Sequence, residues 1–165
     1  MVPVEKLEYW ANKKEKENYR FRTFLKINAD PDKLDEQFGK LHKKYFSEYD
    51  CSLCRNCCKK YCGTIPREDI EADADFLGLS KADFMKKYLK NEPNIEGYNT
   101  KNHPCDFLQN NSCVLIEHKP DSCKNYPYTN QEDRMGSLLS IIENTAICPV
   151  VYEIIEELKS IYDFK

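Results

Sequence analysis

The sequence CSLCRNCC, residues 51–58, places four cysteines within eight residues. Cys51, Cys54 and Cys57 follow one another at C-x-x-C spacing, which lets two sulfurs reach one metal ion from a single turn of chain. Cys57 and Cys58 are neighbours, and adjacent side chains leave the backbone in different directions. The stretch therefore predicts thiolate ligands, with Cys57 and Cys58 serving different metals or different atoms of one cluster. The alternative, four small buried side chains, fails because one short turn offers no apolar pocket for all of them.

Four of the five other cysteines join this stretch as candidate metal ligands. A tetrahedral zinc ion and an iron–sulfur cubane each take four ligands, so eight thiolates would complete two sites. Cys62 is left over, and it is either a further ligand or a free thiol beside the metal. His103 is open in the same way between a ligand and a hydrogen-bond donor to one. The predicted metal ligands are Cys51, Cys54, Cys57, Cys58, Cys105, Cys113, Cys123 and Cys148.

The composition argues against several classes of protein. The chain has 25 Lys and Arg against 28 Asp and Glu, a formal charge of −3, so it has no basic field of the kind that favours nucleic acid. It also has neither the roughly 20 consecutive apolar residues of a membrane span nor an N-terminal secretory signal. We therefore expect a cytoplasmic protein. In that reducing compartment nine cysteines, an odd number, favour metal ions as partners over a disulfide framework.

Apolar periodicity predicts a mainly α fold. Asp30 is a suitable N-cap before Pro31, and Leu34, Phe38 and Leu41 form one apolar stripe on a helix of about 16 residues. Between Asn91 and Ser137 no helical period survives for more than one turn, and turn-forming residues are frequent. Bound metal would tie down such a long loop region, which is otherwise uncommon in a compact domain. Further helices are expected over residues 4–26, from Pro66 to a cap at Gly78, from Ser80 to a point before Pro93, and after Cys148-Pro149.

The expected organisation is a single small helical domain over residues 1–165 with a loop-rich, metal-tied cysteine region. No repeat or linker composition divides the chain. Within this domain we expect a helical N-terminal extension over residues 1–50, the metal-binding region over residues 51–149, and a C-terminal helix over residues 150–165.

Taken together, the cysteine segments resemble the CxxCxxCC family. CSLCRNCC matches the motif that names the family, and its downstream blocks are matched by PCDFL at 104–108, Cys113, Lys119-Pro120 with Cys123, Tyr126 and Pro127, and Cys148-Pro149. The resemblance implies a small, mostly helical bacterial or archaeal protein that chelates zinc or iron. Larger members include the flagellin lysine N-methylases. The chain departs from the pattern in its extra Cys62 and in Lys119, where arginine is more frequent; this change removes a bidentate donor.

Two functions from different classes follow from these observations. The first is a metal-binding protein that holds zinc or iron, as single ions or as an iron–sulfur cluster. The second is a metal-dependent or iron–sulfur enzyme that modifies a protein partner, such as a lysine N-methylase. Against the enzyme, none of the five glycines forms a G-x-G-x-x-G nucleotide loop, and a full set of thiolates leaves a metal no open position. The sequence favours the first function and names no protein partner.

Overall fold

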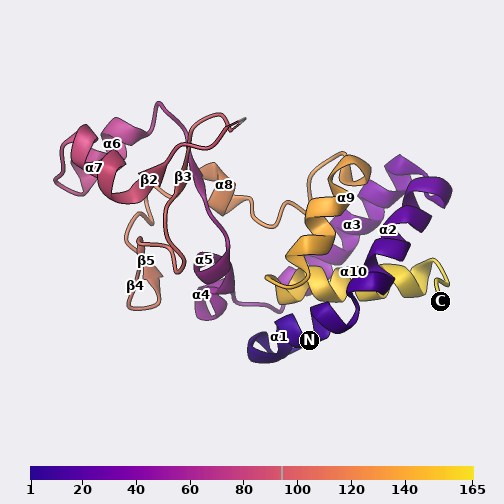
Figure 1. The fold of residues 1–165 in the computed structure, drawn as a ribbon. Helices are drawn as coiled ribbons and strands as arrows, with labels where there is room; N and C mark the ends of the chain where they lie inside the picture. Colours follow the sequence, from indigo (N-terminus) through magenta and orange to yellow (C-terminus); the bar gives the residue numbers. More distant parts are fainter. Residues whose placement is uncertain (94) are drawn as a thin grey trace. The chain divides into compact units, whose positions relative to one another are not determined.

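The chain folds into two units (Figure 1), one from Met1–Cys54 with Pro127–Lys165 and one from Arg55–Tyr126. The structure is a computed structural model, and it describes residues 1–93 and 95–165. Each unit is described by itself below. The expectation of a single domain over residues 1–165 stays a prediction.

The first unit consists of helices (Figure 1). Helix α3 (Pro31–Phe46) packs against α9 (Arg134–Asn144) and α10 (Pro149–Ile161). Helix α2 (Glu15–Asn28) also packs against α9. These helices bury their apolar faces, and Leu7 and Ala11 of the first helix form a cluster with Tyr152 of the last one. The helices are α1 (Val4–Lys13), α2 (Glu15–Asn28), α3 (Pro31–Phe46), the short α4 (Cys51–Cys54), α9 (Arg134–Asn144) and α10 (Pro149–Ile161).

Helix α3 follows the predicted pattern. The Asp30 side chain accepts a hydrogen bond from the backbone N–H of Lys33 at 3.0 Å, and Pro31 occupies the first turn, where its missing N–H costs nothing. Leu34 and Phe38 are fully buried. Helix α10 likewise begins at Pro149, directly after Cys148, as expected. Local capping rules and the spacing of apolar residues were sufficient to predict both helices.

Two features of the first unit differ from the expectation. The helix predicted over residues 4–26 is two helices, because the backbone at Lys14 leaves the helical conformation. Helix α9 was not predicted. Its N-terminus has a local cap, because the Asp133 side chain accepts a hydrogen bond from the backbone N–H of Gly136 at 3.0 Å. A distant residue adds to this cap, since the carboxylate of Asp35 accepts hydrogen bonds from the backbone N–H groups of Asp133 and Arg134 at 2.7 and 2.8 Å.

The second unit combines short helices with small antiparallel sheets (Figure 1). In the three-stranded sheet the order is β1-β3-β2, with Thr64 opposite Asn99 and Leu89 opposite Thr100. A two-stranded hairpin pairs Leu108 with Cys113. The elements are α5 (Asn56–Lys60), β1 (Thr64–Ile65), α6 (Ile70–Phe76), α7 (Lys81–Tyr88), β2 (Leu89–Lys90), β3 (Tyr98–Thr100), β4 (Leu108–Gln109), β5 (Ser112–Cys113) and α8 (Asp121–Lys124).

Local chemistry explains several of these elements. Ser80 caps α7 by accepting a hydrogen bond from the backbone N–H of Asp83 at 3.1 Å, and Gly78 takes a positive φ of 67° after α6, as predicted. The helix expected from Pro66 begins only at Ile70, after a turn. Asn110 and Asn111 both take positive φ, which suits a two-residue hairpin turn between β4 and β5. The short strands were not predicted.

The fold is mainly α, as the periodicity predicts, and the region from Asn91 to Ser137 is loop-rich apart from short strands and helical turns; Asn94 lies outside the described residues. Over the described ranges, no single helix is long and apolar enough to cross a membrane. The pair α9 and α10, bent by 120°, reaches the required length and composition together, a test that buried core helices also pass.

Candidate metal centre

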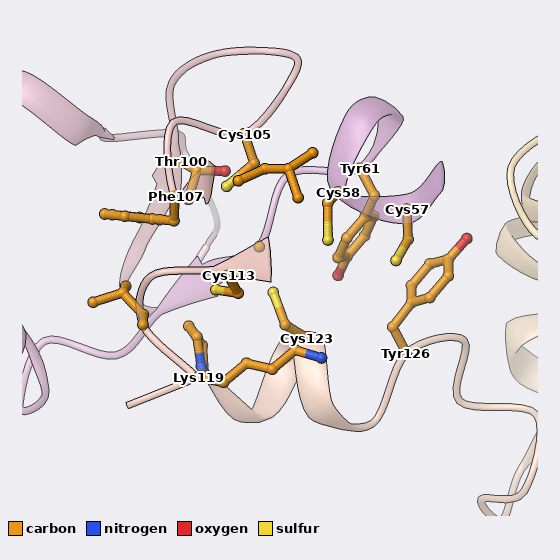
Figure 2. Close-up of a pocket in the computed structure, with 14 residues that line it drawn as sticks. Cys57, Cys58, Tyr61, Thr100, Cys105, Phe107, Cys113, Lys119, Cys123 and Tyr126 are labelled. Atoms are coloured by element: carbon orange, nitrogen blue, oxygen red, sulfur yellow. The ribbon is translucent and has the colours of Figure 1, made fainter. Parts of the chain in front are cut away.

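The second unit contains a partly open cavity of about 40 Å³ whose wall includes five of the nine cysteines (Figure 2). Figure 2 shows the sulfurs of four of them around the same space. These four are Cys58, Cys105, Cys113 and Cys123. The sulfur of Cys57 lies to one side, toward Tyr126, in agreement with the expectation that neighbouring cysteines point in different directions.

Cys58 and Cys105 are held together by the backbone. Cys58 lies in α5, and its carbonyl oxygen accepts a hydrogen bond from the backbone N–H of Cys105 at 2.8 Å. Cys113 belongs to strand β5, where it pairs with Leu108 across the hairpin. Cys105 and Cys113, eight residues apart in sequence, thus both line the cavity.

Cys123 comes from α8, which is fixed to strand β1 by the preceding residue. The Ser122 hydroxyl accepts a hydrogen bond from the backbone N–H of Thr64 and donates one to the carbonyl oxygen of Thr64, each at 2.9 Å. Gly63, just before Thr64, makes room for the thiol: a Cβ at this position would overlap the sulfur of Cys123. The chain thus provides a cradle for this sulfur that any larger residue would fill.

Burial makes three of the four thiols hard to ionise without a metal. It raises the pKa of Cys105 to about 11, and it raises the pKa of Cys113 and of Cys123. Metal binding must then displace protons from these thiols, since the thiolate is the ligand. A buried cysteine with a purely structural role would show the same rise in pKa. The convergence of the sulfurs on one cavity, and not their pKa values, therefore indicates a site.

Cys58 has the opposite character. A hydrogen bond from the Cys57 thiol, with the positive charges of Lys119 and Arg55, lowers the pKa of Cys58 to about 6. Lys119 lines the cavity, and Figure 2 shows its side chain running along the wall toward Cys123. The Arg55 guanidinium also donates a hydrogen bond to the carbonyl oxygen of Asn111 at 3.2 Å. These two cations are placed to offset the negative charge of a thiolate-bound metal.

The other predicted ligands belong to the first unit. Cys51 and Cys54 lie in α4, and Cys148 lies directly before α10. Burial raises the pKa of Cys148 to about 12, and the charges of Cys51 and Cys54 add to this effect. The Tyr49 hydroxyl forms a hydrogen bond with Cys54, which together with burial raises the tyrosine pKa. The electrostatic effect of Cys51 and Cys54 on Cys148 is the observation that relates these three predicted ligands.

Cys62 and His103 contact each other instead of the cavity. The Cys62 sulfur lies 3.0 Å from Nε2 of His103, and neither residue is part of the cavity wall. The contact gives Cys62 a partner of its own outside the four-sulfur group. It agrees with Cys62 being left over from the ligand set.

The donor set and the wall suit a thiophilic metal. Thiolates favour zinc and iron–sulfur clusters over hard cations such as magnesium. Apart from the thiols, the wall is mostly apolar, with Phe107, Leu115 and Pro120 in it. One buried hydroxyl in the wall, that of Thr100, has no hydrogen-bond partner among the described residues. Among the described residues, no group of three or more His, Cys, Asp or Glu side chains is already close enough together to hold a metal ion.

A family model described as a "putative zinc- or iron-chelating domain" matches residues 50–149, more than half of the chain. The chain belongs to the CxxCxxCC family. Membership supports metal binding by this CxxCxxCC protein, with zinc or iron as the metal. No curated protein and no solved structure matches the chain.

Three residues that shape the cavity of this CxxCxxCC protein carry no signal in its sequence. Gly63, Thr100 and Ser122 act through contacts with segments far away along the chain. Gly63 precedes a strand too short to be recognised from periodicity, and a serine or threonine in a polar loop is unremarkable. The structure places Lys119, four residues before Cys123, at the cavity.

Proposed function

We propose that this CxxCxxCC protein holds an iron–sulfur cluster through Cys58, Cys105, Cys113 and Cys123. The observation that carries the proposal is that four thiols from separate segments surround one cavity. Four thiolates are the usual ligand set of a [4Fe–4S] cluster. The motif cysteines alone could not supply it, because only Cys57 and Cys58 of the motif reach this cavity.

The apolar wall of the cavity favours a cluster over one zinc ion. A cluster is protected by apolar walls that limit the access of water. Phe107 and Leu115, both buried, form part of such a wall.

The proposal includes a reducing compartment, the cytoplasm, because an odd number of cysteines, nine in this chain, favours metal binding there over a disulfide framework. It also includes a second thiolate group of Cys51, Cys54 and Cys148 in the first unit. Cys57, a further predicted ligand, belongs to neither of these two groups.

Anaerobic purification followed by iron, sulfide and zinc analysis and a visible spectrum tests the proposal. Brown protein with iron and acid-labile sulfide, lost in the Cys113→Ser variant, is the expected result. Colourless protein with bound zinc would overturn the cluster and keep the metal site. Well-folded protein that binds neither metal after reconstitution would overturn both.

A further inference from the structure

Thr100 is a buried residue whose hydroxyl has nothing to bind. It is 3% exposed, and its Oγ1 has no hydrogen-bond partner in the described part of the chain. A buried polar atom without a partner costs about 1–3 kcal/mol, so native proteins retain few of them and each requires an explanation. The residue lies in the wall of the four-sulfur cavity, which suggests where its partner belongs.

The surrounding strand is not short of hydrogen bonds in general. Thr100 donates its backbone N–H to the carbonyl oxygen of Gly63 at 3.0 Å. The neighbouring buried residue Asn99 is satisfied as well, since it accepts a hydrogen bond from the Thr64 hydroxyl at 2.8 Å and donates one to Glu92 at 3.1 Å. Successive strand residues face opposite sides, so Asn99 faces a side with polar partners and Thr100 faces the cavity. Only the hydroxyl on the cavity side is left unpaired in this pair of residues.

The acceptors that the cavity offers are sulfurs. A neutral thiol is a weak acceptor, whereas a metal-bound thiolate or a cluster sulfide carries negative charge and accepts a hydrogen bond well. A hydroxyl at this position would therefore gain its partner when the metal centre forms. Hydrogen bonds to sulfur are among the features that set the stability and the reduction potential of such centres.

We infer that the Thr100 hydroxyl donates a hydrogen bond to a sulfur of the metal centre held by Cys58, Cys105, Cys113 and Cys123, and so helps the protein to retain that centre. This inference rests on the proposed function. It makes Thr100 a metal-retaining residue although it ligates nothing.

Three variants test the role of the hydroxyl. Thr100→Val keeps the shape of the side chain and removes its donor, and Thr100→Ser keeps the donor. Thr145→Val is the matched control, because Thr145 is equally buried but its hydroxyl donates to the carbonyl oxygen of Ile142 at 2.7 Å, in the first unit. For each protein we would measure metal content, the rate of metal transfer to a chelator, the visible spectrum, and the unfolding midpoint of the metal-free form.

The two Thr100 variants should separate metal retention from folding. Thr100→Val should transfer its metal on the order of tenfold faster than the wild type, with a shifted spectrum, as expected for loss of an outer partner of a metal site. Its metal-free form should be as stable as the wild type or more so, since an unpaired buried hydroxyl has been removed. Thr100→Ser should behave like the wild type. Thr145→Val should lose stability while its metal transfer rate is unchanged.

Two results would overturn the inference while leaving the proposed function intact. One is a loaded Thr100→Val protein that transfers metal at the wild-type rate with an unchanged spectrum. The other is a Thr100→Ser protein that loses metal as fast as Thr100→Val, because the hydroxyl would then not be the cause. A wild-type protein that binds no metal would instead overturn the proposed function, and this inference with it.

Discussion

The Cys123 sulfur occupies the space that a side chain at Gly63 would require. The backbone at Gly63 does not take a positive φ, so alanine is excluded by the sulfur and not by strain. This contact joins a residue beside strand β1 to a cysteine about sixty residues away. It makes the cavity sensitive to a single methyl group.

Gly63→Ala should therefore displace Cys123 and lower the metal content of purified protein. Gly39→Ala is the control, because a Cβ at Gly39 meets no atom within 4 Å and its helix should gain about 0.5–1 kcal/mol from alanine. Metal analysis and the thermal midpoint of each variant check this prediction. Full metal content in Gly63→Ala would show that Cys123 is not a ligand.

Replacement of individual cysteines should divide the predicted ligands from the left-over thiol. We expect Cys54→Ser to lose metal and solubility, since Cys54 is a predicted ligand shared by the overlapping C-x-x-C pairs. Cys62→Ser should be mild, because Cys62 contacts His103 and lies outside the cavity wall. Metal stoichiometry and the soluble fraction after expression measure both effects. Equal loss from the two variants would mean that the ligand assignment is wrong.

Ser122→Ala should loosen the attachment of α8 to β1. The substitution removes both hydrogen bonds to the Thr64 backbone and leaves an N–H group without its partner, at a cost of about 1–2 kcal/mol in unfolding free energy. Chemical denaturation of the metal-free protein measures the change. Ser47→Ala, which removes one exposed hydroxyl contact to Lys44, should stay within about 0.5 kcal/mol of the wild type. A Ser122→Ala protein as stable as this control would contradict the prediction.

Asp73 should make the stability of the protein depend on pH. It is 1% exposed, one of its carboxylate oxygens has no partner in the described residues, and the other lies 3.3 Å from Nδ1 of His118. Burial raises the pKa of Asp73 above its usual 3.8, against the opposing effect of His118. A carboxyl whose pKa is raised on folding contributes stability below pH 3.8, and this contribution is lost as pH rises through the folded-state pKa.

The stability of the wild type relative to Asp73→Asn should accordingly be greatest near pH 4 and fall toward pH 7. Urea midpoints at several pH values provide the measurement. Asp75→Asn, an exposed position on the same helix, is the control and should show a flat difference. An Asp73→Asn difference that grows from pH 4 to pH 7 would have the wrong sign.

Metal removal should affect the two units unequally. The Arg55–Tyr126 unit has short elements, and its cavity is surrounded by the proposed ligand thiols, whereas α3, α9 and α10 bury apolar faces against one another. After treatment with a chelator under reducing conditions, amide hydrogen exchange should accelerate across α5, β4, β5 and α8 while α3 and α10 stay protected. Uniform acceleration across the chain would contradict this expectation.

Some elements could be predicted from sequence because their causes are local. The Asp30 cap with Pro31 and the Ser80 cap are contacts within three residues, so their patterns are visible in the chain itself. Helix α9 was missed although it has a local cap as well, since the Asp133 side chain accepts a hydrogen bond from the backbone N–H of Gly136. The contact of Asp35, about a hundred residues away, with its first N–H groups is the part that the local pattern does not show. The cradle at Gly63 escaped for the same reason: nothing near it in sequence indicates a sulfur.

The sequence by itself determined the thiol-rich chemistry of this protein, the concentration of cysteines at residues 51–58, the family and several of the helices. Only the tertiary structure decided which thiols share a cavity, with Cys58 beside Cys105, Cys113 and Cys123. The physical reason is that the spacing of cysteines along the chain shows only which sulfurs can reach one ion from a single turn. Convergence of distant segments depends on a hairpin, a strand pairing and the Ser122 anchor, none of which is visible in the spacing.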